Sequence, residues 1–440
     1  MQKVQMETIV SLAKTRGFVF PGSDIYGGLA NSWDYGPLGV ELKNNVKAAW
    51  WKRFVHGRID MVGIDGAVIM NPKVWETSGH LSKAFGDEIT ECKNCNERYR
   101  ADHIDMNAPC AKCGKSGQFT EPTTFNIMFK TFMGPKEASA SVVYLRPETA
   151  QAIFADFEQV LTSSRKRIPF GIAQIGKAFR NEITPGNFIF RTREFEQMEI
   201  EYFIRPEDWK EKFEMWLGEI HKWIEFCGIK KELVHDLEVK GKDRAHYSDR
   251  TVDIEFDFPF GRDELYGLAY RTDYDLRKHS EGSGHDLTYT DPESGEKFIP
   301  HVIEPSLGVD RTVLAMLVSA YSEEEAPKAD GGVDKRVVMK FPYALAPVKI
   351  AVLPLSKKPE LRNVAMPIVE KLSAKWNVDY DETQSIGRRY RRQDEIGTPY
   401  CVTVDFDSLE DHAVTVRDRD TMKQDRVAIA ELGEYFNAHL

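Results

Sequence analysis

No apolar run in this sequence is long enough to cross a membrane, and the opening residues, Met-Gln-Lys-Val-Gln-Met-Glu, lack the apolar core of a secretory signal. The sequence also has no Walker phosphate-binding loop. Only six of its 440 residues are cysteine. These absences argue against a membrane-spanning protein and against a P-loop nucleotide site, and they predict a cytoplasmic protein with reduced cysteines.

The composition is that of a large globular protein. Hydrophobic residues make up 42% of the chain, which suffices for a sizeable core and two or three domains. The formal net charge of -10 argues against indiscriminate nucleic-acid binding. A local basic surface can still recognise RNA on an acidic protein, so net charge neither supports nor excludes an RNA partner.

Residues 179–203 combine charge with aromatic rings in the pattern of a β-hairpin. Pro185 and Gly186 favour a turn, and a period of two places one set of side chains on a single sheet face: Arg191, Arg193, Phe195, Gln197 and Glu199. Arginines there can pair with phosphates, and Phe195 can stack on a base. An exposed hairpin with solvated charges gives the same pattern.

The wider sequence favours the nucleotide interpretation. Phe179–Glu182 and Arg191–Phe195 resemble motif 2 of class II aminoacyl-tRNA synthetases, and the stretch from Arg191 to Glu199 is similar to that of the homodimeric glycyl-tRNA synthetases. The resemblance extends over nearly the whole chain. It implies an α+β fold with an antiparallel-sheet catalytic domain, a zinc-ribbon insertion and a C-terminal α/β anticodon-binding domain.

Four of the six cysteines form two Cys-x2-Cys pairs: Cys92, Cys95, Cys110 and Cys113. This spacing predicts a structural zinc ribbon, because four thiolates leave no open coordination position. The ribbon would brace an insertion at about 89–119; reduced thiols without a metal are the alternative. Cys227 and Cys401 stand alone, and we expect both to be buried apolar residues.

Three segments before motif 2 also match the family. A predicted helix over 39–55 and a predicted strand over 68–72 resemble motif 1, at about 36–72, which implies a homodimer; a core helix and strand would give the same pattern. A helix predicted from Leu145 to about Leu161 carries Glu148 in its first turn. In the family this segment lies over the amino acid. Arg100 matches another substrate-contacting position.

After motif 2, residues 206–228 predict an amphipathic packing helix, and residues 251–258 predict a half-buried strand. Glu264 and Leu265 match the family's ATP-binding pair, and the carboxylate of Glu264 suits Mg²⁺. Arg244 and His246 lie where the family approaches the tRNA acceptor end. Residues 303–311 predict a strand-to-helix junction that resembles motif 3, at about 299–321, and residues 1–340 then form the catalytic domain.

The last hundred residues predict a separate unit. Residues 323–332 have the composition of a charged, flexible connection. Strand and helix patterns then alternate over 347–440, which predicts a small α/β domain with a mostly parallel sheet and resembles the anticodon-binding domain of class IIa synthetases. Residues 388–392, four arginines around Tyr390, suit unpaired bases and phosphates, although such clusters also occur as solvated faces.

The resemblance implies a reaction driven by positioning and electrostatics, in which the glycine carboxylate attacks the α-phosphate of ATP and a terminal ribose hydroxyl of tRNA(Gly) then takes the glycyl group. Arg180 would hold the α-phosphate, and Arg191 and Arg311 the distal phosphates. Phe195 would stack adenine against Arg311. Arg180 and Arg311 are the catalytic candidates. The implied ATP-binding set is Arg180, Asn181, Glu182, Phe190, Arg191, Thr192, Arg193, Glu194, Phe195, Glu264, Leu265, Gly308, Val309, Asp310 and Arg311.

Selecting glycine requires that larger amino acids be refused. Glu148, Glu199 and Glu304, with Ser306, can fix the ammonium group and fill the volume of an alanine methyl. The implied glycine-binding set is Arg100, Glu148, Phe195, Glu196, Gln197, Met198, Glu199, Glu304, Pro305, Ser306, Leu307 and Gly308.

Two alternatives remain open on the sequence. One is another class IIa synthetase that charges proline, threonine, serine or histidine, but Glu304-Pro305-Ser306 and the 195–199 stretch favour glycine. The other is a synthetase-derived binding protein without activation, like the accessory subunit of mitochondrial DNA polymerase. The presence of Arg180, Arg191 and Arg311 argues against it, since such a protein can lose those arginines without losing its fold.

Overall fold

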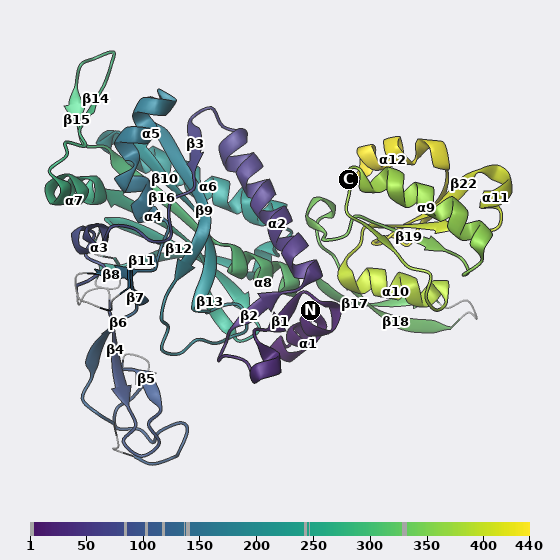
Figure 1. Ribbon diagram of the computed structural model, residues 1–440, viewed down its shortest axis with the longest axis horizontal. Coiled ribbons are helices and arrows are strands. Elements are labelled where there is room, and N and C mark those ends of the chain that lie inside the picture. The colour runs from purple at the N-terminus through teal and green to yellow at the C-terminus, as the bar shows by residue number, and fades with distance from the viewer. Residues whose placement is uncertain are drawn as a thin grey trace.

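The computed structural model describes residues 4–82, 86–101, 104–116, 119–135, 137, 141–241, 244–245, 247–327 and 332–440. His246 lies outside the described residues. The chain forms a large body and a smaller C-terminal body beside it (Figure 1). No helix in the described part of the chain is long and apolar enough to cross a membrane.

A seven-stranded sheet forms the centre of the large body. Its order is β11-β12-β13-β16-β10-β9-β3, and every pairing is antiparallel except that of β3 with β9. The strands are β3 (Met61–Ile64), β9 (Phe170–Phe179), β10 (Glu194–Ile204), β11 (Val234–Val239), β12 (Arg250–Phe258), β13 (Gly261–Thr272) and β16 (His301–Gly308). The predicted antiparallel catalytic sheet is confirmed.

Helices cover both faces of this sheet and create two apolar clusters. On one face α2 (Pro37–Trp51), α6 (Trp209–Phe226) and α8 (Val309–Ala320) pack on side chains such as Met198 and Ile200. On the other face α4 (Ala150–Ala155), α5 (Phe157–Ser164) and α7 (Tyr274–Ser283) pack on Phe170 and Phe203. Alternate residues of β10 therefore serve different layers.

The predicted motif 1 helix is present, and α2 continues into a π-helical turn at Lys52–His56. The predicted strand at 68–72 is wrong: Ile69 makes one isolated bridge to Leu145, and the strand after α2 is β3. Pro72 begins α3 (Pro72–Thr77), where the side chain of Asn71 accepts a hydrogen bond from the N–H of Lys73. Proline suits the first helical position because no partner for its missing N–H is needed there.

The predicted helix from Leu145 to about Leu161 is two helices, α4 and α5, separated at Asp156. Because α4 begins at Ala150, Glu148 precedes the helix and is not in its first turn. Before it lie β7 (Lys130–Phe132) and β8 (Val142–Tyr144), which pair with each other. The cysteine-bearing insertion projects from the large body (Figure 1) as a three-stranded sheet of β4 (Gly86–Glu91), β5 (Arg98–Arg100) and β6 (Thr123–Asn126).

At the N-terminus, α1 (Met6–Arg16) leads into a two-stranded ribbon of β1 (Val19–Pro21) and β2 (Trp33–Tyr35). Residues 22–32 between these strands contain one 3-10 turn, Asp24–Tyr26. A second small ribbon, β14 (Tyr289–Thr290) with β15 (Lys297–Phe298), precedes β16.

The C-terminal body has a five-stranded sheet in the order β20-β19-β21-β22-β23. Its elements are β19 (Ile350–Pro354), α9 (Pro359–Ser373), β20 (Val378–Tyr380), α10 (Ile386–Ile396), β21 (Tyr400–Val404), α11 (Ser408–Asp411), β22 (Ala413–Asp418), β23 (Gln424–Ala428) and α12 (Leu432–His439). The sheet is mixed rather than mostly parallel, because β22 and β23 pair antiparallel to their neighbours. Short connections between neighbouring strands permit only antiparallel pairing.

The predicted flexible connection at 323–332 is also wrong over its described part. Residues 321–327 form β17 (Tyr321–Pro327), which pairs with β18 (Val333–Met339). The acidic run that resembled a linker makes cross-strand ion pairs instead, including one of 2.6 Å between Glu324 and Arg336. Opposite charges on paired strands stabilise a hairpin.

Candidate active site

A cavity of about 500 Å³ opens between β10, β12, β13 and β16, the first turn of α8 and the loop between β9 and β10. It brings together most of the residues predicted from the sequence: Arg100, Glu148, Arg180, Glu182, Phe190, Arg191, Thr192, Phe195, Glu196, Gln197, Glu199, Glu264, Leu265, Glu304, Ser306, Gly308, Asp310 and Arg311.

Among the described residues, the other members of the two predicted sets do not line this cavity: Asn181, Arg193, Glu194, Met198, Pro305, Leu307 and Val309. The side chains of Met198, Leu307 and Val309 are buried in the apolar cluster on the far face of the sheet. Glu194 pairs with Lys177 at the surface. A binding role for these seven residues stays a prediction, and the geometry of the cavity does not favour it.

The acidic end of the cavity is built on β10 and β16. Glu199 pairs across the sheet with Ser306, whose hydroxyl donates a 2.8 Å hydrogen bond to its carboxylate. The hydroxyl of Thr149 donates to the other carboxylate oxygen of Glu199. Burial and the nearby charge of Glu148 raise the pKa of Glu199, against the effect of these two hydrogen bonds. The carboxylate is thus held in one orientation.

Glu148 lies at the same end, with its carboxylate 3.3 Å from His80 and 3.0 Å from the amide of Gln151. Burial opposes its charge, but His80 and Arg271 outweigh that cost and hold the pKa of Glu148 well below its usual value. Glu148 is therefore held in its charged form. A positively charged ammonium group is the ligand that complements it.

Arg271 on β13 is the cation at the centre of this acidic group. It donates to Glu304 at 2.7 Å and to both oxygens of Asp275 at 2.7 and 2.9 Å, and it lies over the ring of Tyr247 at 3.8 Å. Burial raises the pKa of Glu304 to about 8, with Arg271 opposing the shift. One guanidinium thus partly neutralises two buried carboxylates.

Glu201 lies two residues after Glu199 on the same face of β10 and is fully buried. Neither carboxylate oxygen has a hydrogen-bond partner among the described residues. Burial and the neighbouring Glu304 raise the pKa of Glu201 well above its usual value. A neutral, protonated Glu201 follows, because an unpaired buried carboxylate is very costly.

Another part of the cavity wall combines arginines and aromatic rings with two further acidic groups. The Arg180 guanidinium lies 5.4 Å from the Phe195 ring, and its Nε donates to the carbonyl of Pro147 at 3.0 Å. The Arg311 guanidinium lies 4.4 Å from the Phe190 ring and 3.2 Å from a carboxylate oxygen of Glu264. Burial together with Glu264 raises the pKa of Asp253 to about 7. Two cations and two acidic groups thus face one volume.

The loop between β9 and β10 departs from the predicted turn at Pro185 and Gly186. Its tip is at 187–190, between the bridged residues Gly186 and Arg191. Phe188, Ile189 and Phe190 are buried in the apolar cluster around α2 and α8. The tip is therefore part of the core rather than an exposed hairpin end.

Glu196 and Asp310 line the cavity but direct their carboxylates toward α2. Lys43 lies 2.8 Å from Glu196 and 3.0 Å from Asp310, and Lys47 lies 3.1 Å from Glu196. Asp310 also accepts a 2.8 Å hydrogen bond from the backbone N–H of Glu196 and one from the hydroxyl of Tyr35. These two acids connect β10, α8 and α2.

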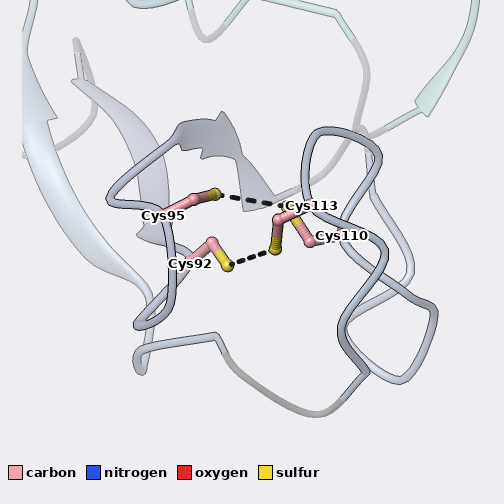
Figure 2. Close-up of side chains that lie close together, drawn as sticks. All are labelled: Cys92, Cys95, Cys110 and Cys113. Atoms are coloured by element: carbon pink, nitrogen blue, oxygen red, sulfur yellow. Dashed lines mark hydrogen bonds between the residues drawn. The ribbon is translucent and has the colours of Figure 1, made fainter.

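The four cysteines of the insertion converge, as Figure 2 shows. Their sulfur atoms lie within 4.8 Å of one another, with 3.7 Å between Cys92 and Cys113 and between Cys95 and Cys110. A tetrahedral site with Zn–S bonds of about 2.3 Å has sulfurs about 3.8 Å apart. The donor set and its spacing thus fit a tetracysteine metal site. As predicted, Cys227 and Cys401 are buried alone.

Several residues of the site were not found from the sequence: His80, Gln151, Tyr247, Asp253, Arg271 and Asp275. Asp253 had a signal, because alternation with the buried Val252 and Ile254 sends it to the opposite face of β12. For Arg271 and Asp275 the signal was only weak: opposite charges four residues apart, where β13 ends, can form an ion pair. In the C-terminal body, one residue of the predicted RNA-binding cluster at 388–392 is not available to RNA. Arg389 is buried and donates to three backbone carbonyls.

Two family models match this chain: the tRNA synthetase class II core domain (G, H, P, S and T) over residues 136–320, and the anticodon binding domain over residues 349–439. A glycine–tRNA ligase of Caldanaerobacter subterraneus subsp. tengcongensis is 54% identical, over 100% of this chain and 99% of its own length. One from Clostridium acetobutylicum is 55% identical over 98% and 97% of the two chains.

The chain belongs to the glycine–tRNA ligases. This settles the choice of amino acid that the sequence left open among class IIa synthetases, and it removes the alternative of a binding protein without activation. A crystal structure of prolyl-tRNA synthetase from Cryptosporidium parvum with halofuginone and AMPPNP has a TM-score of 0.63 at 15% identity, covering 98% of this chain and 74% of that one. It supports the shared fold alone.

Proposed function

We propose that the cavity carries both steps of glycyl transfer and that its two ends divide the substrates between them. The observation that carries the proposal is one cavity lined both by the acidic residues Glu148, Glu199 and Glu304 and by the arginines Arg180, Arg191 and Arg311. Glycine lies at the acidic end and ATP at the basic end. The glycine carboxylate then points toward the α-phosphate.

In the first step a carboxylate oxygen of glycine attacks the α-phosphorus of ATP. A new P–O bond forms, the bond to the bridging oxygen of the β-phosphate breaks, and pyrophosphate leaves with that electron pair. Arg180 stabilises the charge that develops on the α-phosphate, because its guanidinium lines the cavity and is held in place by the carbonyl of Pro147 and the ring of Phe195. Arg191 and Arg311 hold the distal phosphates, and Phe195 stacks on adenine.

Mg²⁺ would be held by the carboxylates of Glu264 and Asp253, whose hard oxygen atoms suit it, and it would neutralise charge on the leaving phosphates. Arg311 already lies against Glu264, so one acidic group orients this arginine and faces the phosphates. The chain's own part is to fix the positions of these charges before the substrates bind.

In the second step a hydroxyl of the terminal ribose of tRNA(Gly) attacks the glycyl carbonyl carbon. The bond from that carbon to the phosphate oxygen breaks, AMP leaves, and the proton of the hydroxyl passes to solvent or to the phosphate. Arg244 and Arg100 also line the cavity, and the tRNA end would enter beside them. The anticodon-binding domain holds the distant part of the same tRNA.

Glycine selection follows from the crowding of the acidic end. Glu148 binds the ammonium group, and the bonded pair of Glu199 and Ser306 occupies the volume into which a side chain would project.

We propose a homodimer formed through motif 1, since β3 ends the sheet beside Ile59, an apolar residue that is 94% exposed. We also propose a structural Zn²⁺ on the four cysteines.

The test is amino-acid-dependent ATP–pyrophosphate exchange without tRNA, with each proteinogenic amino acid in turn. We expect exchange with glycine alone, and its loss in Arg180→Ala with the fold retained. Arg167→Ala is the matched control, because Arg167 is exposed, pairs with Glu293 at the surface and does not line the cavity. Wild-type exchange by Arg180→Ala would refute the division of roles proposed here.

A further inference from the structure

The loop between β1 and β2 lies on the loop between β9 and β10, although more than 150 positions separate them in sequence. The side-chain amide of Asn31 donates to the carbonyl of Arg191 at 2.6 Å and to that of Gly186 at 3.4 Å. In the opposite direction, Arg193 donates to the carbonyl of Ala30 at 3.1 Å. The contact is therefore reciprocal and entirely polar at this point.

Trp33 fixes the orientation of the Asn31 amide. The indole N–H donates to Oδ1 of Asn31 at 2.9 Å, so the oxygen faces Trp33 and the amide N–H groups face the two carbonyls. The Trp33 ring also contacts Phe188 edge-on, with 4.8 Å between ring centroids. One short segment thus contacts both the start and the end of the turn at 187–190.

That turn needs support from outside itself. Gly186 and Arg191 exchange backbone hydrogen bonds of 3.0 and 3.2 Å, and between them Asn187 and Phe188 have φ of 56° and 60°. The left-handed conformation costs about 1–2 kcal/mol for a residue such as Phe. A conformation of this kind persists only when surrounding contacts hold it. Asn31 and Trp33 supply such contacts at the two carbonyls and at the Phe188 ring.

We propose that Asn31 is a positioning residue for Arg191, holding the backbone from which this arginine reaches the distal phosphates of ATP. The inference rests on the proposed role of Arg191. A fixed carbonyl at 191 fixes the direction in which the side chain leaves the backbone, so less conformational freedom is lost when phosphate binds. Asn31 itself touches no substrate in this scheme.

Asn31→Asp is the sharpest variant, because it keeps the shape, tolerates the left-handed φ of 50° at this position and still accepts from Trp33. It replaces the donor with a charged acceptor facing two carbonyls. We expect the KM for ATP in exchange to rise at least about tenfold, which corresponds to the loss of roughly one hydrogen bond. The KM for glycine should change less than about twofold.

A stable glycyl-adenylate analogue without distal phosphates separates positioning from general damage. Its affinity should be the same in Asn31→Asp and wild type. Asn31→Gly, which suits the left-handed backbone, keeps the test possible if the charge prevents folding; it should raise the KM for ATP by a smaller factor. Ser23→Asp is the matched control, since it adds the same charge at an exposed, left-handed position of the same loop.

Arg191→Ala distinguishes the two levels of the proposal. If it raises the KM for ATP and neither Asn31 variant does, the inference about Asn31 is overturned and the role of Arg191 stands. If Arg191→Ala leaves the KM for ATP unchanged, the proposed role of Arg191 fails first. If the Asn31 variants weaken ATP, glycine and the analogue together, their effect is merely structural, and the positioning role is overturned.

Discussion

The amino group of Lys43 lies 3.0 Å from the Oδ1 atom of Asp310, and it also pairs with Glu196 at 2.8 Å. Glu196 follows Phe195 and Asp310 precedes Arg311, so one cation on α2 fixes the separation of the two groups proposed to enclose adenine. The predicted ATP and glycine sets placed Asp310 and Glu196 against substrate. The structure shows their carboxylates engaged with α2.

Lys43→Met should leave two carboxylates facing each other without their shared cation. We expect a loss of about 3 kcal/mol in the free energy of unfolding, measured by urea denaturation, and a raised KM for ATP. The double variant Lys43→Met, Glu196→Gln should recover part of the stability, because it removes one of the two facing negative charges, although Lys47 still pairs with Glu196 in the single variant. A double variant no more stable than Lys43→Met would contradict this account.

Glu304→Ala should cripple glycine activation, by about 100-fold or more in kcat/KM, with the fold retained. Arg271 would lose one of its two buried partners and disturb Asp275 and Tyr247. Pyrophosphate exchange measures the effect. Lys278→Ala, at an exposed position of the neighbouring helix α7, serves as the control, and full glycine activity in Glu304→Ala would show that this carboxyl does not form the pocket.

Glu201→Gln should change how stability depends on pH. The folded-state pKa of Glu201 lies above its unfolded value, so the folded protein binds the extra proton and stability falls as pH rises from about 4.3 toward the folded pKa. Gln cannot titrate. The difference in Tm between variant and wild type should therefore move in favour of the variant by about 2–4 °C between pH 5 and pH 8. A difference that is constant over this range would mean that Glu201 is not held neutral.

Arg388→Ala and Arg389→Ala form a matched pair on α10. Arg389 is buried and donates to three carbonyls, so its loss should lower the stability of the C-terminal domain by about 2–4 kcal/mol. Arg388 is exposed, and its loss should leave the Tm unchanged but raise the KM for tRNA in charging several-fold. Pyrophosphate exchange without tRNA should not respond to Arg388→Ala. An Arg389→Ala protein as stable as the wild type would contradict the structural role given to the buried Arg389.

Removal of metal with a chelator should unfold the insertion and leave the central sheet intact. The four cysteine sulfurs proposed to hold Zn²⁺ all belong to the insertion, whose strands β4, β5 and β6 form a sheet separate from the central one. Zinc content by mass spectrometry of metals, together with hydrogen exchange of residues 86–126, measures the effect. Exchange that stays slow in this region after complete metal removal would show that the cysteines do not depend on a metal for their structure.

The sequence predicted those parts of the site that alternate along one element. Glu199 and Ser306 were expected in one pocket, and they are cross-strand partners. Features that depend on contacts between distant elements were out of reach. Nothing in the local pattern shows that Glu196 turns toward Lys43, or that Asn31 reaches Arg191, because period-two alternation gives the face of a strand but not its partner. The prediction of a flexible connection at 323–325 was wrong for the same reason, since the ion-pair partners of Glu324 are Arg336 and Lys340 on another strand and beyond it.

The β17–β18 hairpin begins where α8 ends, and the N–H of Lys340 donates to the carbonyl of Ala320 at 2.8 Å. Because its two ends touch, the hairpin adds no length between the catalytic body and the C-terminal body. Its buried Arg336 donates to Asp394 at 3.2 Å and to the carbonyl of Arg419 at 3.0 Å (compare β18 and α10 in Figure 1). The segment therefore acts as a bracket rather than a flexible tether: through the buried Arg336 it joins the last turn of α8, the helix that carries Arg311, to the anticodon-binding domain.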